Sequence, residues 1–246
     1  MYSVLQNKSK MIFNFSTFPY LIIDDALPID LYNKLKSNFP RNEKIIGQNE
    51  YKDNYAYRYN ANQSLNDPEI SNEWKEFIRY HTSFNFINDF YDIFGDSIKK
   101  IYKVEKEKLF NENSIGVRFQ KQSHFNLDCQ FVINTPTIEE TSVIEPHLDN
   151  PVEFYAALLY MRDDDDDSEG GSLTTYTFKD KPSFYGKSRV REDKINLIEE
   201  IEYKKNRLVM FLNSPYSLHG VTKRTKTNFY RKYINIIGEF NFELFN

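Results

Sequence analysis

The chain has 246 residues, of which 40% are hydrophobic and 16% aromatic, enough for one domain with a substantial apolar core. Its 32 Lys and Arg against 36 Asp and Glu give a formal net charge of −4, which argues against a nucleic-acid or anionic-membrane partner. The one cysteine, Cys129, excludes an internal disulfide, and with neither a secretory signal nor a membrane-spanning apolar run we expect a cytoplasmic protein.

The first part of the chain predicts helices after one short strand. Residues 18–23 form an apolar run suited to a strand, and from Pro28 an apolar residue recurs every four positions until Pro40 ends the pattern. Two further helices follow, one beginning near residue 67 and one that we expect to start at an N-cap Thr82 and to stop at Gly95. Their apolar faces are Ile70, Trp74, Phe77 and Ile78, and then Phe84, Ile87, Phe90, Tyr91 and Phe94.

After about residue 114 the pattern changes to short segments rich in β-branched and aromatic residues. They are residues 115–120, 127–133, 152–161, 172–178, 207–212 and 229–240. Helices followed by many strands predict an α+β fold in which helices brace a β-sandwich or jelly roll. We expect one domain over residues 1–246, with 1–113 as a helix-rich supporting part and 114–246 as the core that carries the functional site.

Two connecting segments stand out by composition. Five consecutive aspartates at 163–167 repel one another, so a flexible, solvated loop is the expected structure, and the spacing of ligands in calcium loops is missing. Residues 179–194 mix aromatic and basic side chains, including Phe184 and Tyr185. This segment is either a lid over a substrate or a polar connection, because loops of this length are often functional.

The pattern His147-Leu148-Asp149, with His219 seventy residues beyond Asp149, is the main candidate site. Residues i and i+2 of a strand share a face, so His147 and Asp149 can hold one metal ion while His219 arrives from a neighbouring strand. Two imidazoles and a carboxylate that leave coordination positions open are typical of non-heme Fe(II) oxygenases. The simpler alternative is that these are ordinary hydrogen-bonded histidines. Against it, His81 and His124 have no carboxylate at strand spacing.

Arg231 adds a second element to this site. The segment 231–236 alternates strictly, so Arg231, Tyr233 and Asn235 share one face. If that face lines a barrel interior, the buried guanidinium requires an anion, and a dicarboxylate cosubstrate that chelates the metal would supply it. Alternatively, Arg231 pairs with an internal acidic residue or reaches solvent from an edge strand.

Taken together, these residues resemble the 2-oxoglutarate and Fe(II)-dependent dioxygenase superfamily, in particular its prolyl-hydroxylase-like branch. The resemblance extends over nearly the whole chain, because residues 18–28 are similar to the first strand and helix of many such enzymes. The matching motifs are His147-Leu148-Asp149, Gly170-Gly171-Ser172-Leu173, Leu218-His219-Gly220-Val221 and Arg231.

The resemblance implies a double-stranded β-helix, or jelly roll, with His147 and Asp149 on its second core strand, His219 on the seventh and Arg231 on the eighth. It implies Fe(II) at the triad, 2-oxoglutarate and O2 as cosubstrates, and ascorbate as a candidate reductant. The expected reaction hydroxylates a C–H bond and releases succinate and CO2. Because Asp149 is intact, halogenation is not expected. Tyr233, Gln130 and Tyr160 are further candidates for cosubstrate binding.

Two alternatives stay open at this stage. One is a cupin-like metalloenzyme, such as a zinc isomerase or hydrolase, that uses the triad without 2-oxoglutarate. The other is a non-enzymatic jelly roll that binds carbohydrate through aromatic side chains. The substrate, whether small molecule, sugar or peptide, and the oligomeric state cannot be read from the sequence.

Overall fold

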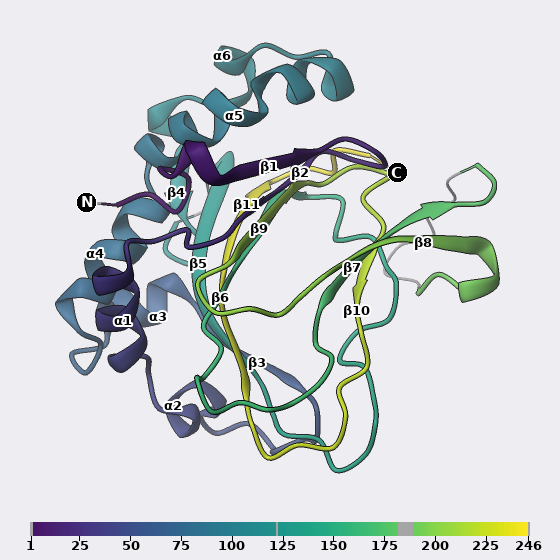
Figure 1. Ribbon diagram of the computed structural model, residues 1–246. Helices are drawn as coiled ribbons and strands as arrows, with labels where there is room; N and C mark the ends of the chain where they lie inside the picture. Colours follow the sequence, from purple (N-terminus) through teal and green to yellow (C-terminus); the bar gives the residue numbers. More distant parts are fainter. Residues whose placement is uncertain (1, 122, 182–188, 246) are drawn as a thin grey trace.

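The computed structural model describes residues 2–121, 123–181 and 189–245, and Figure 1 shows its helices gathered on one side of a large sheet. The helices are α1 (Ile29–Ser37), α2 (Asn42–Ile46), α3 (Ala61–Asn66), α4 (Asn72–His81), α5 (Phe84–Tyr102) and α6 (Lys106–Leu109), with short 3-10 turns at Lys8–Lys10, Glu112–Ser114 and Glu192–Lys194. The strands are β1 (Met11–Asn14), β2 (Tyr20–Ile23), β3 (Ala56–Tyr59), β4 (Ile115–Val117), β5 (Phe125–Asn134), β6 (Glu153–Tyr160), β7 (Leu173–Phe178), β8 (Ile195–Ile201), β9 (Leu208–Leu212), β10 (His219–Val221) and β11 (Arg231–Phe240).

The strands form two sheets. The larger runs in the order β1-β2-β9-β6-β11-β5-β3, with β4 paired in parallel to β5, and the smaller runs β10-β7-β8. In Figure 1 the small sheet lies on the side of the large sheet away from the helices. This two-sheet jelly roll with helices on one side is the predicted α+β fold, and each of the six strand segments predicted after residue 114 overlaps an observed strand. Strands β1, β3 and β8 were not predicted.

The helices cover the outer face of the large sheet through aromatic packing. The ring of Trp74 on α4 meets Phe131 on β5 edge-on, with centroids 4.7 Å apart, and Phe90 on α5 lies 4.5 Å from Tyr155 on β6. All four side chains are buried, and they belong to one continuous apolar cluster. Fully burying such a side chain contributes roughly 1.5–3 kcal/mol, so this layer is the main source of stability.

The ends of the two long predicted helices differ from expectation. Ser83 takes the N-cap position of α5. Thr82 is the C-cap of α4, and its hydroxyl donates a hydrogen bond of 2.8 Å to the carbonyl of Ile78. Gly95 lies inside α5 and does not stop it. A glycine in a helix costs about 1 kcal/mol relative to alanine. Here the apolar face continues past Gly95 with the buried Ile98, and the ring of Tyr91 lies where a larger side chain at 95 would project.

The aspartate run at 163–167 is anchored to the fold at three of its members, and the prediction that the run is solvated is wrong for Asp166. Asp163 pairs with Lys232 at 2.8 Å, and Asp164 pairs with Lys36 at 2.7 Å. Asp166 is buried, and its carboxylate accepts the backbone N–H of Ser168 at 2.9 Å. Cations from distant segments therefore offset the repulsion within the run. Across the described ranges, no helix combines the length and apolar character that crossing a membrane requires.

Candidate functional site

The side chains of His147, Asp149 and His219 meet between the two sheets. The two histidines form an antiparallel bridge, in which the N–H of His147 donates to the carbonyl of His219 at 2.8 Å and the reverse bond is 3.1 Å. Nε2 of His147 lies 3.5 Å from Oδ1 of Asp149, and Nε2 of His219 lies 3.6 Å from Oδ2. One ligand atom from each residue lies within 4.8 Å of the other two, so one ion can be reached by all three.

The local backbone differs from the one predicted for this motif. His147 and Asp149 were expected to share a face of one regular strand. In the structure His147 contributes only the single bridge to His219, and residues 148–150 belong to no strand. The side chains converge because His147 is fixed against β10 and the chain leaves that bridge just before Asp149, ahead of the turn into β6.

Backbone carbonyls fix the tautomer of both imidazoles. Nδ1 of His147 lies 2.8 Å from the carbonyl of Glu145, and Nδ1 of His219 lies 2.8 Å from the carbonyl of Ser217. A carbonyl only accepts, so Nδ1 carries the hydrogen in each ring, and in the neutral ring the Nε2 lone pair faces Asp149. Lone pairs on two nitrogens and a carboxylate that face one another repel unless a cation lies between them. This donor set therefore fits a metal ion.

The protonation states of His219 and Asp149 also suit a metal ion. Burial lowers the pKa of His219, and this outweighs the opposite influence of Asp149, so the imidazole is neutral near pH 7. Burial by itself would raise the pKa of Asp149, but the neighbouring His219, His147 and Arg58 outweigh burial and lower it to about 2. An ionised carboxylate beside a neutral imidazole is the protonation state that metal binding requires.

The triad opens into a cavity of about 520 Å³ between the sheets. Gln130 and Asn134 of β5 and Arg231, Tyr233 and Asn235 of β11 line one wall, since alternate residues of these strands face inward. Such a volume suits a small ligand.

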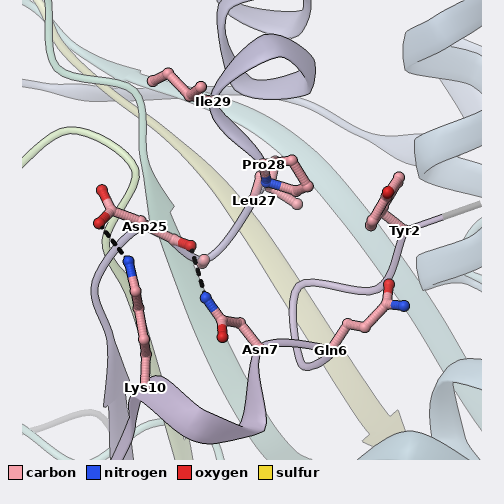
Figure 2. A pocket seen from close by; sticks show the side chains of 9 residues that line it. Tyr2, Gln6, Asn7, Lys10, Asp25, Leu27, Pro28 and Ile29 are labelled. Atoms are coloured by element: carbon pink, nitrogen blue, oxygen red, sulfur yellow. Dashed lines mark hydrogen bonds and ion pairs between the residues drawn. The ribbon is translucent and has the colours of Figure 1, made fainter.

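A second cavity, of about 570 Å³, lies near the N-terminal segment, far from the triad in sequence and on other elements (Figure 2). Its charged groups satisfy each other, because Nζ of Lys10 lies 2.7 Å from Asp25 and the amide of Asn7 donates to the carbonyl of Asp25 at 3.3 Å. With its charged groups paired and no metal-binding cluster among its lining residues, this cavity is a weaker candidate than the one at the triad.

Arg231 is buried at the base of the triad cavity, with 2% of its surface exposed. Its Nε donates to the carbonyl of Gly171 at 2.7 Å and Nη1 donates to Oδ1 of Asn134 at 3.1 Å, while Nη2 and the Nδ2 of Asn134 have no partner. Within the described residues Arg231 forms no ion pair, and its side chain is buried. Both alternatives raised by the sequence, an internal acidic partner and exposure to solvent, are therefore wrong. Two unsatisfied buried donors beside a buried cation mark the place of an anion.

The glycine pair 170–171 has a steric role in this arrangement. Both residues have positive φ, 80° and 75°, and a Cβ on Gly171 would lie 3.1 Å from Cδ of Arg231. A Cβ on Gly170 would collide with the carbonyl of Lys223 at 1.8 Å. The turn therefore requires glycine, and it brings the carbonyl of Gly171 onto the guanidinium.

Of the other three residues predicted to contact the cosubstrate, two line the cavity and one lies behind its wall. Tyr233 and Gln130 line the cavity, and the Tyr233 ring lies 4.8 Å from the guanidinium carbon of Arg231. Gln130 donates to Asp128 at 2.6 Å, which leaves its Oε1 without a partner. Tyr160 is fully buried and lies 5.2 Å from the Arg231 guanidinium, behind the cavity wall.

Charged residues that the motif analysis did not single out line the same cavity. Arg58 on β3, Arg118 after β4 and Glu153 at the start of β6 all face it. Burial, reinforced by the charge of Asp149, raises the pKa of Glu153 to about 8. The alternation of Ala56 and Arg58 with two tyrosines was the available signal for β3, but its four residues were too short to indicate a strand. The segment 179–194, expected to be either a lid or a polar connection, lies partly outside the described residues, because it includes 182–188 with Phe184 and Tyr185.

Comparisons with known proteins agree with this reading of the site. Residues 133–237 match the model of the 2OG-Fe(II) oxygenase superfamily, a range that contains His147, Asp149, His219 and Arg231. No curated protein matches the sequence.

Several solved structures are similar in shape at low identity. A prolyl-4-hydroxylase from Pseudomonas putida shares 12% identity at a TM-score of 0.48, over 98% of this chain and 100% of its own. A prolyl 4-hydroxylase from Phytophthora capsici shares 14% identity at a TM-score of 0.49, over 90% of this chain and 59% of its own. HygX from Streptomyces hygroscopicus, with nickel, 2-oxoglutarate and hygromycin B bound, shares 11% identity at a TM-score of 0.48, over 93% of this chain and 85% of its own.

The family match and the donor set specify the cofactors together. Fe(II) and 2-oxoglutarate give the family its name, and an imidazole, imidazole and carboxylate cluster beside an unpartnered buried guanidinium suits both. The part of the chain that carries the triad and Arg231, residues 133–237, is thus similar to the 2OG-Fe(II) oxygenase superfamily.

Proposed function

We propose that this protein hydroxylates a C–H bond of a small substrate, within a single domain formed by residues 1–246. In the balanced reaction, O2 places one oxygen atom in the new hydroxyl group and the other in succinate, while 2-oxoglutarate loses CO2. The proposed metal ligands are His147, Asp149 and His219. The observation that carries the proposal is their arrangement, in which both Nε2 lone pairs and an ionised carboxylate face one another.

The tail of 2-oxoglutarate is assigned to the Arg231 end of the cavity. Its distal carboxylate would accept from Nη2 of Arg231 and Nδ2 of Asn134, the two donors that lack partners. Charge-assisted bonds of this kind are stronger than neutral ones, and they would satisfy groups whose burial is otherwise costly. Tyr233 supports the guanidinium by stacking, and Gln130 offers a further polar contact from the same wall.

Fe(II), 2-oxoglutarate and O2 supply the oxidising chemistry when bound, and the protein supplies position and environment. Glu145 and Ser217 hold the two imidazoles in the tautomer that binds metal, through their backbone carbonyls. Phe211 packs against the His219 ring with centroids 4.5 Å apart and shields that side of the site from water. Of the two alternatives, the cupin-like enzyme leaves the two orphan donors unexplained, and a carbohydrate-binding module has no need of the triad.

The test is to incubate the purified protein with Fe(II), 2-oxoglutarate and O2, alone and with panels of candidate substrates. Succinate and the gain of one oxygen atom are measured by mass spectrometry. We expect succinate above the protein-free background and its loss in Asp149→Ala. Asp165→Ala is the matched control, because it removes an exposed carboxylate far from the triad in sequence. No succinate from the unaltered protein, or equal succinate from both variants, would refute the proposal.

A further inference from the structure

A basic and an acidic side chain flank the triad without partners among the described residues. Arg58 and Glu153 both line the cavity, and neither side chain forms a hydrogen bond or an ion pair with another described residue. The pairing of Arg58 with Val132 on β5 places its side chain on the inner face of the large sheet. Arg58 lowers the pKa of both Asp149 and Glu153, Asp149 raises that of Glu153, and all three residues line the same cavity, so Arg58 and Glu153 lie around one space beside the triad.

The other charges that line this cavity are already engaged. Nε of Arg118 lies 2.8 Å from the carboxylate of Glu239, and Arg231 is held at the opposite end by Gly171 and Asn134. Strand β11 separates these ends, with Arg231 at its start and Glu239 near its last residue. The proposed 2-oxoglutarate site therefore occupies one end, and a free cation and a free carboxyl group remain for another ligand.

Resting on the proposed function, we infer that the substrate is a free amino acid whose carboxylate binds Arg58 and whose ammonium binds Glu153. A zwitterion supplies an anion for Arg58 and a cation for Glu153, whose raised pKa the bound ammonium group would lower so that the carboxyl group ionises. Arg58 is exposed and Glu153 half-buried, which places the cation at the mouth and the carboxyl group farther in. A molecule of this size also suits a cavity of about 520 Å³ that has to hold 2-oxoglutarate as well. An internal residue of a folded protein carries neither terminal charge.

Charge-assisted hydrogen bonds contribute roughly 1.5–3 kcal/mol each, so losing either partner should weaken substrate binding about 10-fold to 100-fold. The preference for the free amino acid should be stronger over its N-acetyl form, which leaves Glu153 unpaired, than over its amide. A site built for a polar group rejects analogues that leave that group unpaired.

The experiment screens the twenty proteinogenic L-amino acids, their amides, their N-acetyl forms and the same residues within acetylated, amidated peptides. Two readouts are taken, namely binding to the protein with Fe(II) and 2-oxoglutarate in anaerobic calorimetry, and succinate release in air. We expect at least one free amino acid to bind and to stimulate succinate release, with its amide and N-acetyl form at least about 10-fold weaker.

Variants locate the two charges. Arg58→Ala should raise the KM for the amino acid at least about 10-fold and remove the preference over the amide, while Glu153→Gln should remove the preference over the N-acetyl form. Arg79→Ala on the exposed face of α4 is the matched control and should behave as the unaltered protein. Binding of 2-oxoglutarate to each variant reports correct folding.

The inference is overturned if the blocked forms or the peptides work as well as free amino acids, if no amino acid binds, or if Arg58→Ala matches Arg79→Ala. Failure of the proposed function looks different, since the unaltered protein would then neither bind 2-oxoglutarate with iron nor form succinate at all.

Discussion

The two faces of the large sheet carry opposite kinds of residue on the same strands. On β5, Phe131 and Ile133 point outward into the apolar layer under the helices, while Gln130 and Asn134 point inward to the triad cavity. On β11 the buried cation Arg231 begins the inward set. The outer face satisfies itself by packing, whereas the inner face retains donors and charges without partners. Strand alternation thus separates stability from function residue by residue.

The largest effect should come from the triad, on the small-sheet side of the cavity. His219→Ala should abolish iron-dependent succinate formation, because it removes one of the three proposed metal ligands, the one whose neutral state burial secures. His124→Ala is the matched control, since this histidine packs against Phe240 and Phe242 away from the triad. Anaerobic iron titration of both variants checks the result, and equal iron binding by the two would contradict the assignment.

On the outer face the expected effect is on stability. Phe131→Ala should lower the free energy of unfolding by about 3–5 kcal/mol, the usual cost of removing a buried phenylalanine. Its ring contacts both Trp74 and Phe39. At a temperature where the variant stays folded, its KM for 2-oxoglutarate should equal that of the unaltered protein. Denaturant titration and steady-state kinetics measure the two quantities, and a changed KM with unchanged stability would break the comparison.

The stability of the fold should also depend on pH through the buried His81 of α4. Burial lowers the pKa of His81 to about 4, and its Nε2 accepts the N–H of Val4 at 3.1 Å. The unfolded chain binds this proton near pH 6.5, so the folded state loses stability as the pH falls from about 6.5 to about 4. The loss approaches about 3 kcal/mol at the lower limit. Denaturant unfolding at pH 7 and pH 4.5 should show a smaller pH difference for His81→Gln, and an identical difference would disprove this origin.

The smallest of these effects should be on cosubstrate affinity at the inner face. Arg231→Ala should raise the dissociation constant of 2-oxoglutarate about 30-fold, or about 2 kcal/mol, through the loss of a charged hydrogen-bond partner. Arg231→Lys keeps the charge but not the planar fork, so it should fall in between. Anaerobic calorimetry measures the affinity. A lysine variant weaker than the alanine variant would mean that Arg231 acts through packing alone.

The sequence was informative where a pattern depends on near neighbours along the chain. Alternation placed Arg231 and Tyr233 on one face, and the spacing of His147, Asp149 and His219 marked them as one cluster, although the backbone that unites them is a single bridge and not a strand. Residues that depend on partners far along the chain were harder to interpret.

Gly95 shows this for a helix, because packing of the apolar face decides whether α5 continues past it. The aspartate run shows it for charge, since its anchors Lys36, Lys205 and Lys232 come from three other segments. For the same reason the sequence did not show that Arg58 and Glu153 lie together beside the triad. Only the fold shows that neither side chain has a partner among the described residues.

The most direct test of the account is a crystal structure of the protein with Mn(II) in place of Fe(II) and with 2-oxoglutarate, prepared without oxygen. We predict one metal ion bound by Nε2 of His147, Nε2 of His219 and the carboxylate of Asp149, with the distal carboxylate of 2-oxoglutarate on Nη2 of Arg231 and Nδ2 of Asn134. A metal ion bound elsewhere, or a cosubstrate whose distal carboxylate lies away from Arg231, would contradict it.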